Sequence, residues 1–157
     1  GANMAPVLFQ RVPVGNIPIS EKIFGSHKTY RGFLIGILIG ILILFFQRAI
    51  SDFMVSWELI SYGDLSILQT VFLGISFGGG ALGGDLAKSF FKRRLKIPPG
   101  GRWMPFDQLD FLGALLCVSI FFIPPLPHII ALFIISPILM IITDILGYQL
   151  GLRDVWW

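Results

Sequence analysis

Four long apolar stretches, separated by shorter polar segments, dominate the pattern along this chain. They cover residues 32–50, 65–84, 111–127 and 129–148, and the second of them has no charged side chain. A helix needs about 20 largely apolar residues to cross the hydrocarbon core of a bilayer. Each stretch is continuously apolar rather than alternating, which excludes a membrane β-barrel. The pattern predicts an all-α, polytopic transmembrane helix bundle with four spans, in one membrane-embedded domain over residues 1–157.

The composition also indicates a membrane protein. Hydrophobic residues make up 55% of the chain, and the charged fraction of 13% is about half the ~25% typical of soluble domains. The mean hydropathy is +0.81. The single cysteine, Cys117, lies inside an apolar stretch, so the sequence offers neither a disulfide framework nor a thiolate metal site. We expect Cys117 to be a small buried apolar side chain.

The distribution of charge predicts an orientation in the membrane. Basic residues concentrate in residues 11–31, before the first apolar stretch, and in residues 88–102, between the second and the third. The loop over residues 52–64 has three acidic residues and no Lys or Arg. Because basic loops stay in the cytoplasm, we expect the segments 1–31 and about 86–109 to be cytoplasmic. The prediction is a multi-pass protein of the cell membrane with its polar site facing the cytoplasm.

Glycines recur at helical spacing within two of the apolar stretches. They form one series and two pairs: Gly32, Gly36 and Gly40, then Gly79 with Gly83, and Gly80 with Gly84. Small residues four apart allow helices in a membrane to approach closely, so we expect these positions to serve helix packing. Gly83 and Gly84 are also expected to give a ligand room to approach the backbone.

The segment "GGDLAKSFFKRRLKIPPGGRWMPFDQLDF", residues 83–111, is the most polar part of the chain between two apolar stretches. On a helix that continues out of the second stretch, one face carries Asp85, Lys88, Ser89 and Lys92. The Pro-Pro-Gly-Gly sequence at residues 98–101 ends that helix and reverses the chain. Asp107 and Asp110 then return to the membrane surface, where we expect them to lie near Asp85.

Carboxylates with Lys and Arg at a water boundary suit a magnesium–nucleotide site. Magnesium takes one or two protein carboxylates, and basic side chains neutralise the remaining phosphate charge. Two structural interpretations stay open at this point. The basic cluster could only set topology or touch anionic headgroups, and the carboxylates could pair with Lys88 or cap the third span at its positive end. Ionisable groups at membrane depth favour the functional interpretation.

Five sequence blocks together resemble the archaeal CDP-archaeol synthases. In chain order they are "ANMAP", "HKTYRGF", "GGDLAKSFFKRR", "PPGGRWMPFDQLDF" and "GYQLGLRDVWW". The third and fourth blocks are also similar, more loosely, to the signature of bacterial and eukaryotic CDP-diacylglycerol synthases. The resemblance implies a magnesium-dependent cytidylyltransferase that transfers CMP from CTP to an archaeal ether-lipid phosphate, 2,3-bis-O-geranylgeranylglycerol 1-phosphate, releasing pyrophosphate. It implies CTP, membrane lipids and no nucleic acid as partners, and leaves the oligomeric state open.

The resemblance also implies which residues form the site. The positions expected to bind magnesium are Asp85, Asp107 and Asp110. The other positions expected to be catalytic, through phosphate contacts, are Lys88, Lys92 and Arg93. Those expected to bind substrate are Asn3, Pro6, Lys28, Thr29, Arg31, Ser89, Arg94 and Gln108, and Pro105 belongs to the same motif.

Two departures and two alternatives accompany this resemblance. The family pattern predicts a further transmembrane helix before "ANMAP", hence five spans in all, and an asparagine where this chain has Asp144. A small transporter or lipid-binding protein is the rival class, although the chain shows none of the inverted repeats that would favour it. A CDP-diacylglycerol synthase acting on ester lipids is the alternative within the same chemistry.

Overall fold

The computed structural model describes residues 1–4, 15–51, 65–98, 101–104, 106–120 and 123–152. Its helices are α2 (Glu21–Phe24), α3 (Tyr30–Ser51), α4 (Ile67–Arg94), the 3-10 helix η1 (Phe106–Gln108), α5 (Phe111–Ser119) and α6 (Leu126–Gln149). Within these described ranges there is no β-strand, only one isolated bridge between Pro18 and Thr29. The predicted all-α class is confirmed.

Three of the described helices, α3, α4 and α6, are long and apolar enough to cross a membrane. Among the described residues, the helix that begins the third predicted span, α5, has 9 residues and ends at Ser119. At 1.5 Å per residue, α5 extends about 14 Å, roughly half the ~30 Å hydrocarbon core. Prolines at 124, 125 and 127 lie at the following turn, where α6 begins. The predicted count of four full spans is therefore not confirmed. The prediction of long apolar helices able to cross a membrane is confirmed for α3, α4 and α6.

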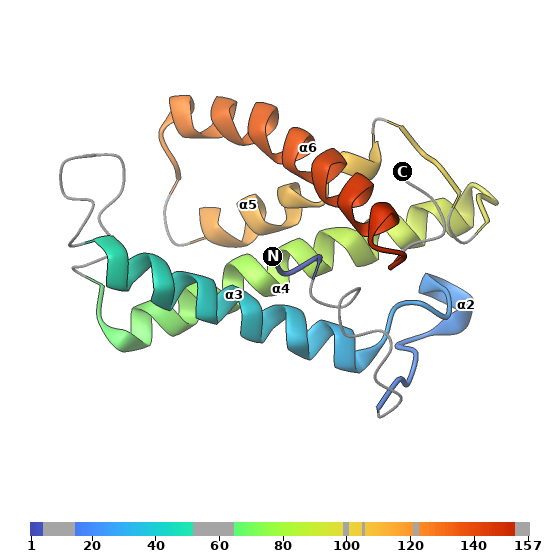
Figure 1. Cartoon of the computed structure of the whole chain (residues 1–157), viewed down its shortest axis with the longest axis horizontal. Helices are drawn as coiled ribbons and strands as arrows, with labels where there is room; N and C mark the ends of the chain where they lie inside the picture. Colours follow the sequence, from blue (N-terminus) through green and yellow to red (C-terminus); the bar gives the residue numbers. More distant parts are fainter. Residues whose placement is uncertain (5–14, 52–64, 99–100, 105, 121–122, 153–157) are drawn as a thin grey trace.

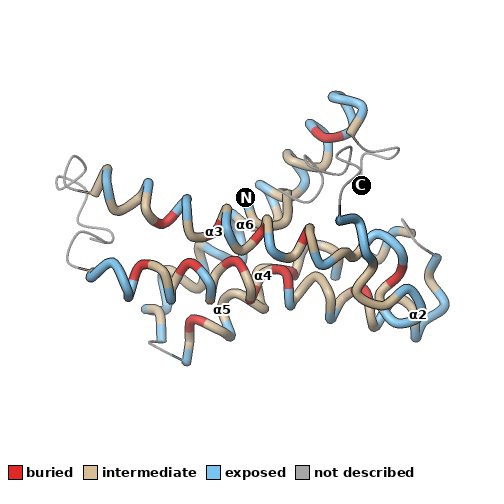
Figure 2. The backbone as a smooth tube through the Cα atoms, turned by 90° about the horizontal axis from the view of Figure 1, so that it is seen from below, coloured by how far each residue is buried: buried red, intermediate tan, exposed pale blue. Residues whose placement is uncertain are grey.

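Helix α4 is the centre of the bundle, with α3 along one side and α5 along the other (Figure 1). Its start is fixed by a capping box in which Ser66 and Gln69 exchange hydrogen bonds with each other's backbone amides. Buried positions gather along α4 and the faces that meet it, whereas α6 has a single buried residue, Gly147 (Figure 2). The core is thus a seam along α4 rather than a large apolar interior.

The predicted glycine packing is confirmed at Gly40, Gly80 and Gly84, but it is not confirmed for the pair Gly79 and Gly83. A Cβ atom at Gly40 would stand 2.9 Å from the carbonyl oxygen of Gly74 in α4, and one at Gly80 would stand 2.7 Å from Cα of Ala114 in α5. Backbones this close leave no space for a side chain, so any larger residue would force the helices apart. Gly84 meets the backbone of Asp110 in the same way.

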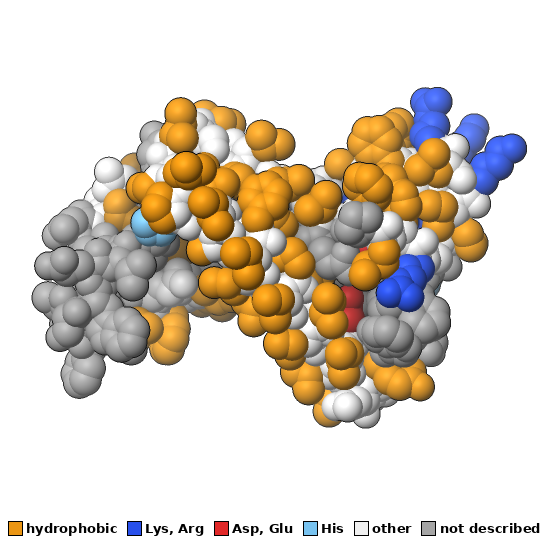
Figure 3. All heavy atoms as spheres, turned by 90° about the horizontal axis from the view of Figure 1, so that it is seen from above, with side chains coloured by type: hydrophobic (Ala, Val, Ile, Leu, Met, Phe, Trp, Pro, Cys, Tyr) orange, Lys and Arg blue, Asp and Glu red, His pale blue; other side chains and the backbone are white. Residues whose placement is uncertain are grey.

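Apolar side chains also cover much of the outer surface (Figure 3). On α6 they include Leu126, Ile134 and Ile138, each more than half exposed. Such a surface is unfavourable in water, but it is what a lipid-facing helix presents to hydrocarbon. The blue Lys and Arg side chains gather at one end of this face, and a red carboxylate is visible in a hollow beside them. On this face, apolar side chains therefore predominate, and the Lys and Arg side chains are confined to one end.

Candidate active site

Lys28 reaches the site from the segment that precedes α3. The backbone amide of Ile19 donates to the carbonyl oxygen of Lys28 at 2.7 Å, and Tyr30 donates to Ile17 at 3.1 Å. The hydroxyl of Thr29 accepts from the amide of Gly32 at 3.1 Å, which caps the first turn of α3. These local bonds place the Lys28 side chain against α4, where its ammonium group pairs with the Asp85 carboxylate.

The last turns of α4 present the predicted polar face. Lys88 Nζ lies 3.4 Å from Oδ1 of Asp85, one turn earlier on the helix. Ser89 is buried, and its hydroxyl donates to the carbonyl oxygen of Asp85 at 2.8 Å, so it supports the helix backbone. Lys92 Nζ donates to the carbonyl oxygen of Gly101 at 2.7 Å and lies 2.5 Å from Oδ1 of Asp107. Lys92 thus ties α4 to the returning loop.

The returning loop is held by Asp107. Its Oδ2 accepts from the amide of Trp103 at 2.6 Å, and its own amide donates back to the Trp103 carbonyl at 3.0 Å. Its backbone carbonyl accepts from Lys88 at 3.1 Å. Through these bonds, η1 and the start of α5 come to lie against α4 at Lys88.

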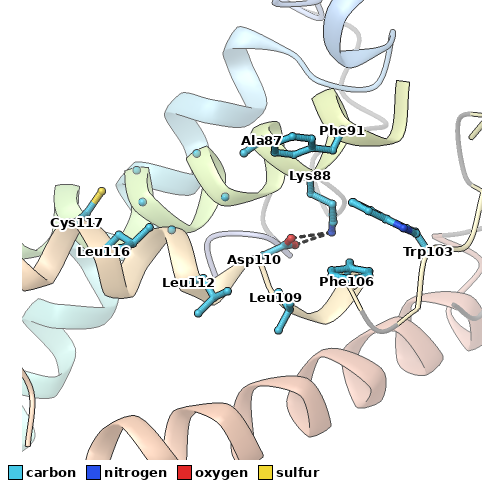
Figure 4. Close-up of a pocket in the computed structure, with 15 residues that line it drawn as sticks. Ala87, Lys88, Phe91, Trp103, Phe106, Leu109, Asp110, Leu112, Leu116 and Cys117 are labelled. Carbon is cyan, nitrogen blue, oxygen red and sulfur yellow. Dashed lines mark hydrogen bonds and ion pairs between the residues drawn. The ribbon is translucent and has the colours of Figure 1, made fainter. Parts of the chain in front are cut away.

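Lys88 is the centre of the charge network, because its ammonium group faces two carboxylates. One belongs to Asp85 on α4 and the other to Asp110, just before α5. Lys88 Nζ lies 2.8 Å from both carboxylate oxygens of Asp110 (Figure 4). The amide nitrogen of Asn3 donates to Oδ2 of Asp110 at 3.3 Å. The network is a chain of contacts from Lys28 to Asp85, Lys88, Asp110 and Asn3. It therefore joins the segment before α3, helix α4, the start of α5 and the N-terminal segment.

Asp110 is the most buried member, with 3% of its surface exposed. Burial raises the pKa of its carboxyl group to about 6, and the negative charge of Asp85 acts in the same direction. The ammonium groups of Lys88 and Lys28 oppose this shift without cancelling it. The Oδ1 atom of Asn3 is buried and has no hydrogen-bond partner among the described residues. The network thus retains a free acceptor beside its most buried carboxylate.

Three other predicted residues, Arg93, Arg94 and Arg31, contact residues outside this network. One guanidinium nitrogen of Arg93 donates to the carbonyl oxygen of Ile97 at 2.6 Å, and its Nε is buried without a hydrogen bond. The guanidinium of Arg94 lies over the ring of Phe90, 5.3 Å from the centroid, and Arg31 donates to Asn16 at 3.5 Å. Outside the described residues are Pro6, Pro105 and the side chain of Gln108.

An apolar groove lies beside the same charge network, and Lys88 and Asp110 belong to both. The groove has a volume of about 460 Å³ and runs between α4 and the segment from Trp103 to Cys117 (Figure 4). The stacked rings of Trp103 and Phe106, with centroids 4.7 Å apart, line it beside Lys88. Trp103 and Phe106 were not among the residues predicted from the sequence, although aromatic residues three positions apart in a polar loop were a possible signal.

Comparison with known proteins assigns the chain to a family. The model of the family described as "CarS-like: CDP-archaeol synthase" matches residues 12–157. The chain belongs to this CDP-archaeol synthase family. The resemblance inferred from the five sequence blocks is thereby confirmed, and the network of Lys28, Asp85, Lys88 and Asp110 lies within the matched residues.

Curated relatives agree with the family match. A CDP-archaeol synthase of Methanospirillum hungatei is 34% identical over 97% of this chain and 96% of its own length. One from Methanocaldococcus jannaschii is 36% identical over 87% and 77%, and one from Pyrobaculum islandicum is 38% identical over 87% and 75%. No solved structure matches the chain significantly.

The donor set of this family member fits magnesium through two of the three predicted carboxylates. Asp85 and Asp110 approach one cationic group from two sides, which matches the one or two carboxylates that magnesium takes from proteins. Asp107 is instead engaged by Lys92 and the Trp103 amide. Among the described residues, no three His, Cys, Asp or Glu side chains come close enough to surround an ion by themselves. Phosphate oxygens and water would complete the coordination shell.

The position of Lys88 leads to a stability prediction. A Lys88→Met variant leaves the largely buried carboxylates of Asp85 and Asp110 without their shared cation. We expect its free energy of unfolding to be about 3–5 kcal/mol lower than that of the wild type. Adding Asp110→Asn to that variant should restore much of the loss, because it removes the charge that is left without a cation, whereas Asp85 keeps its pair with Lys28. Thermal unfolding in detergent measures both effects.

The matched control is Lys22→Met, which removes a cation from an exposed position on α2. We expect its stability to stay within about 0.5 kcal/mol of the wild type, as for most surface substitutions. Equal stability of the Lys88→Met and Lys22→Met proteins would contradict the assignment of Lys88 as the centre of a buried network.

Proposed function

We propose that this protein is an enzyme that transfers CMP from CTP to the phosphate of 2,3-bis-O-geranylgeranylglycerol 1-phosphate. The products are a CDP-archaeol-type lipid and pyrophosphate, for the synthesis of membrane ether phospholipids. The observation that carries the proposal is the meeting of a charged network and an apolar groove at Lys88, in a chain of this family. A nucleotide phosphate and a lipid phosphate require such a boundary, since one comes from water and the other from the bilayer.

The alternatives receive less support. The family match and the names of the curated relatives both indicate a synthase, not a transporter or a lipid-binding protein. A diacylglycerol phosphate would present the same headgroup, but the relatives are named for archaeol products. We therefore place the ether lipid first and the enzyme class above both alternatives.

The chemistry is controlled by charge. A phosphate monoester has its second pKa near ~6, so the lipid phosphate is largely a dianion at neutral pH and needs little help from a general base. One of its oxygens attacks the α-phosphorus of CTP, a new P–O bond forms, and the bond to the β-phosphate breaks. The electron pair of that bond leaves with pyrophosphate. The main barrier is repulsion between two anions.

The basic side chains of the site lower this barrier. Lys28 and Lys88 approach the site from α3's start and from α4, so together they can face a phosphate group from two sides. Lys92 and Arg93 lie one turn further along α4, where the longer triphosphate can extend. Ammonium and guanidinium groups form charge-assisted hydrogen bonds with phosphate oxygens, and these are stronger where water is excluded. Binding CTP therefore requires the lysines to exchange carboxylate partners for phosphate partners.

Magnesium is the proposed cofactor. Asp85 and Asp110 would hold it, with Asp107 contributing through water, and it would supply positive charge to the triphosphate and the departing pyrophosphate. Asp85 and Asp110 face the same ammonium, which supports this pairing. The Asn3 side chain would keep Asp110 oriented through its hydrogen bond at 3.3 Å.

The decisive experiment is a transfer assay with purified protein in detergent. Given radiolabelled CTP, magnesium and the geranylgeranyl ether-lipid phosphate, we expect a labelled CDP-lipid and an equal amount of pyrophosphate. CTP should be strongly preferred over ATP, because hydrogen-bonding groups that read the cytosine edge would be left unpaired by adenine. Protein that binds CTP but releases no pyrophosphate with any lipid phosphate would contradict the proposed function.

We further propose that the site faces the cytoplasm of a multi-pass protein in the cell membrane. The three apolar helices support the membrane location, and the basic residues of segments 11–31 and 88–102 support the orientation. In a Cys117→Ser background, a cysteine replacing Leu65 should react with an impermeant maleimide from outside intact cells. A cysteine replacing Lys96 should react only after the membrane is opened, and the reverse result would exclude a cytoplasmic CTP site.

A further inference from the structure

The groove beside the charge network has dimensions and a lining that suit a hydrocarbon chain. It follows α4 from Lys88 back to Gly79, nine residues or about 14 Å along the helix axis. Cys117 stands at one end of the groove, and its charged residues, Lys88 and Asp110, lie towards the other end, where Trp103 continues the lining beyond Lys88 (Figure 4). Its volume of about 460 Å³ is within the range of small-molecule binding sites.

The glycines of α4 divide into two groups at this groove. A Cβ atom at Gly80 would stand 2.7 Å from the backbone of α5, so helix packing explains why Gly80 has no side chain. Gly83, by contrast, lines the groove, and a Cβ atom there would have no atom of the described residues within 4 Å. Packing therefore does not account for Gly83. The effect of this glycine is to keep the groove wide at its middle.

The groove also opens towards the surface that lipid contacts. Leu116 of α5 lines the groove and is 70% exposed. A chain dissolved in the bilayer can thus enter from the side, without leaving hydrocarbon. Leaving the bilayer would cost about 0.8 kcal/mol for each CH₂ group of the chain. The exposed apolar lining and the buried cation towards one end together match an amphiphile with an anionic headgroup.

We propose that this groove binds one of the two isoprenoid chains of the lipid phosphate, and that Gly83 determines the width of chain it admits. The proposal rests on the proposed function, which supplies the lipid phosphate. The phosphate is held at Lys88, and the chain extends along Gly83 and Gly79 towards Cys117. An isoprenoid chain carries methyl branches, and these need the width that the absent side chain at Gly83 provides.

The chain's single cysteine gives a direct test, because Cys117 is half-buried rather than buried as predicted, and it lies at the end of the groove away from Lys88. Wild-type protein in phosphatidylcholine nanodiscs is treated with an apolar maleimide, without CTP or magnesium, so that no reaction with the lipid occurs. With geranylgeranyl ether-lipid phosphate at about ten times its dissociation constant, we expect modification of Cys117 to slow about tenfold. Glycerol 1-phosphate, which has the headgroup and no chains, should leave the rate unchanged.

A substitution series at Gly83 tests the width. We expect Gly83→Leu to lower the ratio of kcat/KM for the geranylgeranyl lipid to that for a short unbranched lipid phosphate by roughly 10- to 200-fold, the range for a steric change in an apolar pocket. Gly83→Ala is the matched variant and should lower this ratio much less. CTP binding by each variant verifies that the charge network has folded.

The outcomes separate this inference from the proposed function. Wild-type protein that makes CDP-lipid but shows no lipid protection of Cys117 would overturn the groove proposal and leave the enzyme assignment intact. Protection of Cys117 in a protein that makes no CDP-lipid would support the groove and overturn the enzyme assignment. If Gly83→Leu does not fold, the Cys117 measurement on the wild type still decides whether the groove binds the lipid chain.

Discussion

An Asp85→Asn variant is expected to synthesise CDP-lipid about 10²–10³ times more slowly than the wild-type enzyme. Asparagine keeps the size of the side chain but removes the charge that faces Lys28 and Lys88. The loss of one preorganised electrostatic group at a reacting centre commonly has an effect of this size. The measurement is the rate of pyrophosphate release at saturating CTP, with the variant's folding verified by its elution in detergent.

Asp110→Asn should lower the rate by a similar factor, since Asp110, just before α5, also faces the ammonium group of Lys88. The matched control is Glu21→Gln, the same chemical change at an exposed position in the first turn of α2. It should leave turnover close to wild type. Near-normal activity in Asp85→Asn, Asp107→Asn and Asp110→Asn alike would instead favour the structural interpretation, in which these carboxylates only pair with lysines and cap a helix.

Removal of divalent cations is expected to have the largest effect on the enzyme. Chelation should lower CDP-lipid formation by about 10³-fold or more, because several kcal/mol of charge stabilisation at the triphosphate are lost. Adding magnesium back should restore the rate, whereas adding sodium to the same ionic strength should not. The second addition is the control, since it screens charge without coordinating phosphate.

Metal titrations of the variants extend this prediction. If Asp85 and Asp110 hold the ion, their asparagine variants should need a higher magnesium concentration for half of their own maximal rate. An Arg94→Gln variant, changed at a guanidinium that lies over Phe90, should keep the wild-type magnesium requirement. Full activity of the chelated wild-type enzyme would remove magnesium from the proposed mechanism.

Much of the site's composition could be predicted because its members are close in sequence. Asp85, Lys88 and Lys92 are spaced by helical turns, so a helix alone brings them to one face. The turn at residues 98–101 indicated that Asp107 and Asp110 return to α4, and the contacts of Lys88 and Lys92 bear this out. Local geometry and one chain reversal were sufficient for these residues.

The ion-pair partners were less predictable. The sequence grouped three carboxylates, whereas the structure places Asp85 and Asp110 at Lys88 and engages Asp107 with Lys92. Lys28 meets Asp85 although 57 residues separate them. Such choices depend on the angle and register at which helices pack, and hydropathy carries no information about either.

By itself, the sequence determined the helical membrane class, the charged segment on α4 and the family. These properties follow from composition and short-range spacing, because a helix in lipid satisfies its backbone hydrogen bonds within its own segment. Only the tertiary structure decided that α5 is a short helix, that Gly80 serves packing while Gly83 lines a groove, and that the groove lies beside the charge network at Lys88. These features depend on which atoms of distant segments come within a few ångströms of each other. The spacing of glycines is the same in both groups, so only the neighbouring helix distinguishes them.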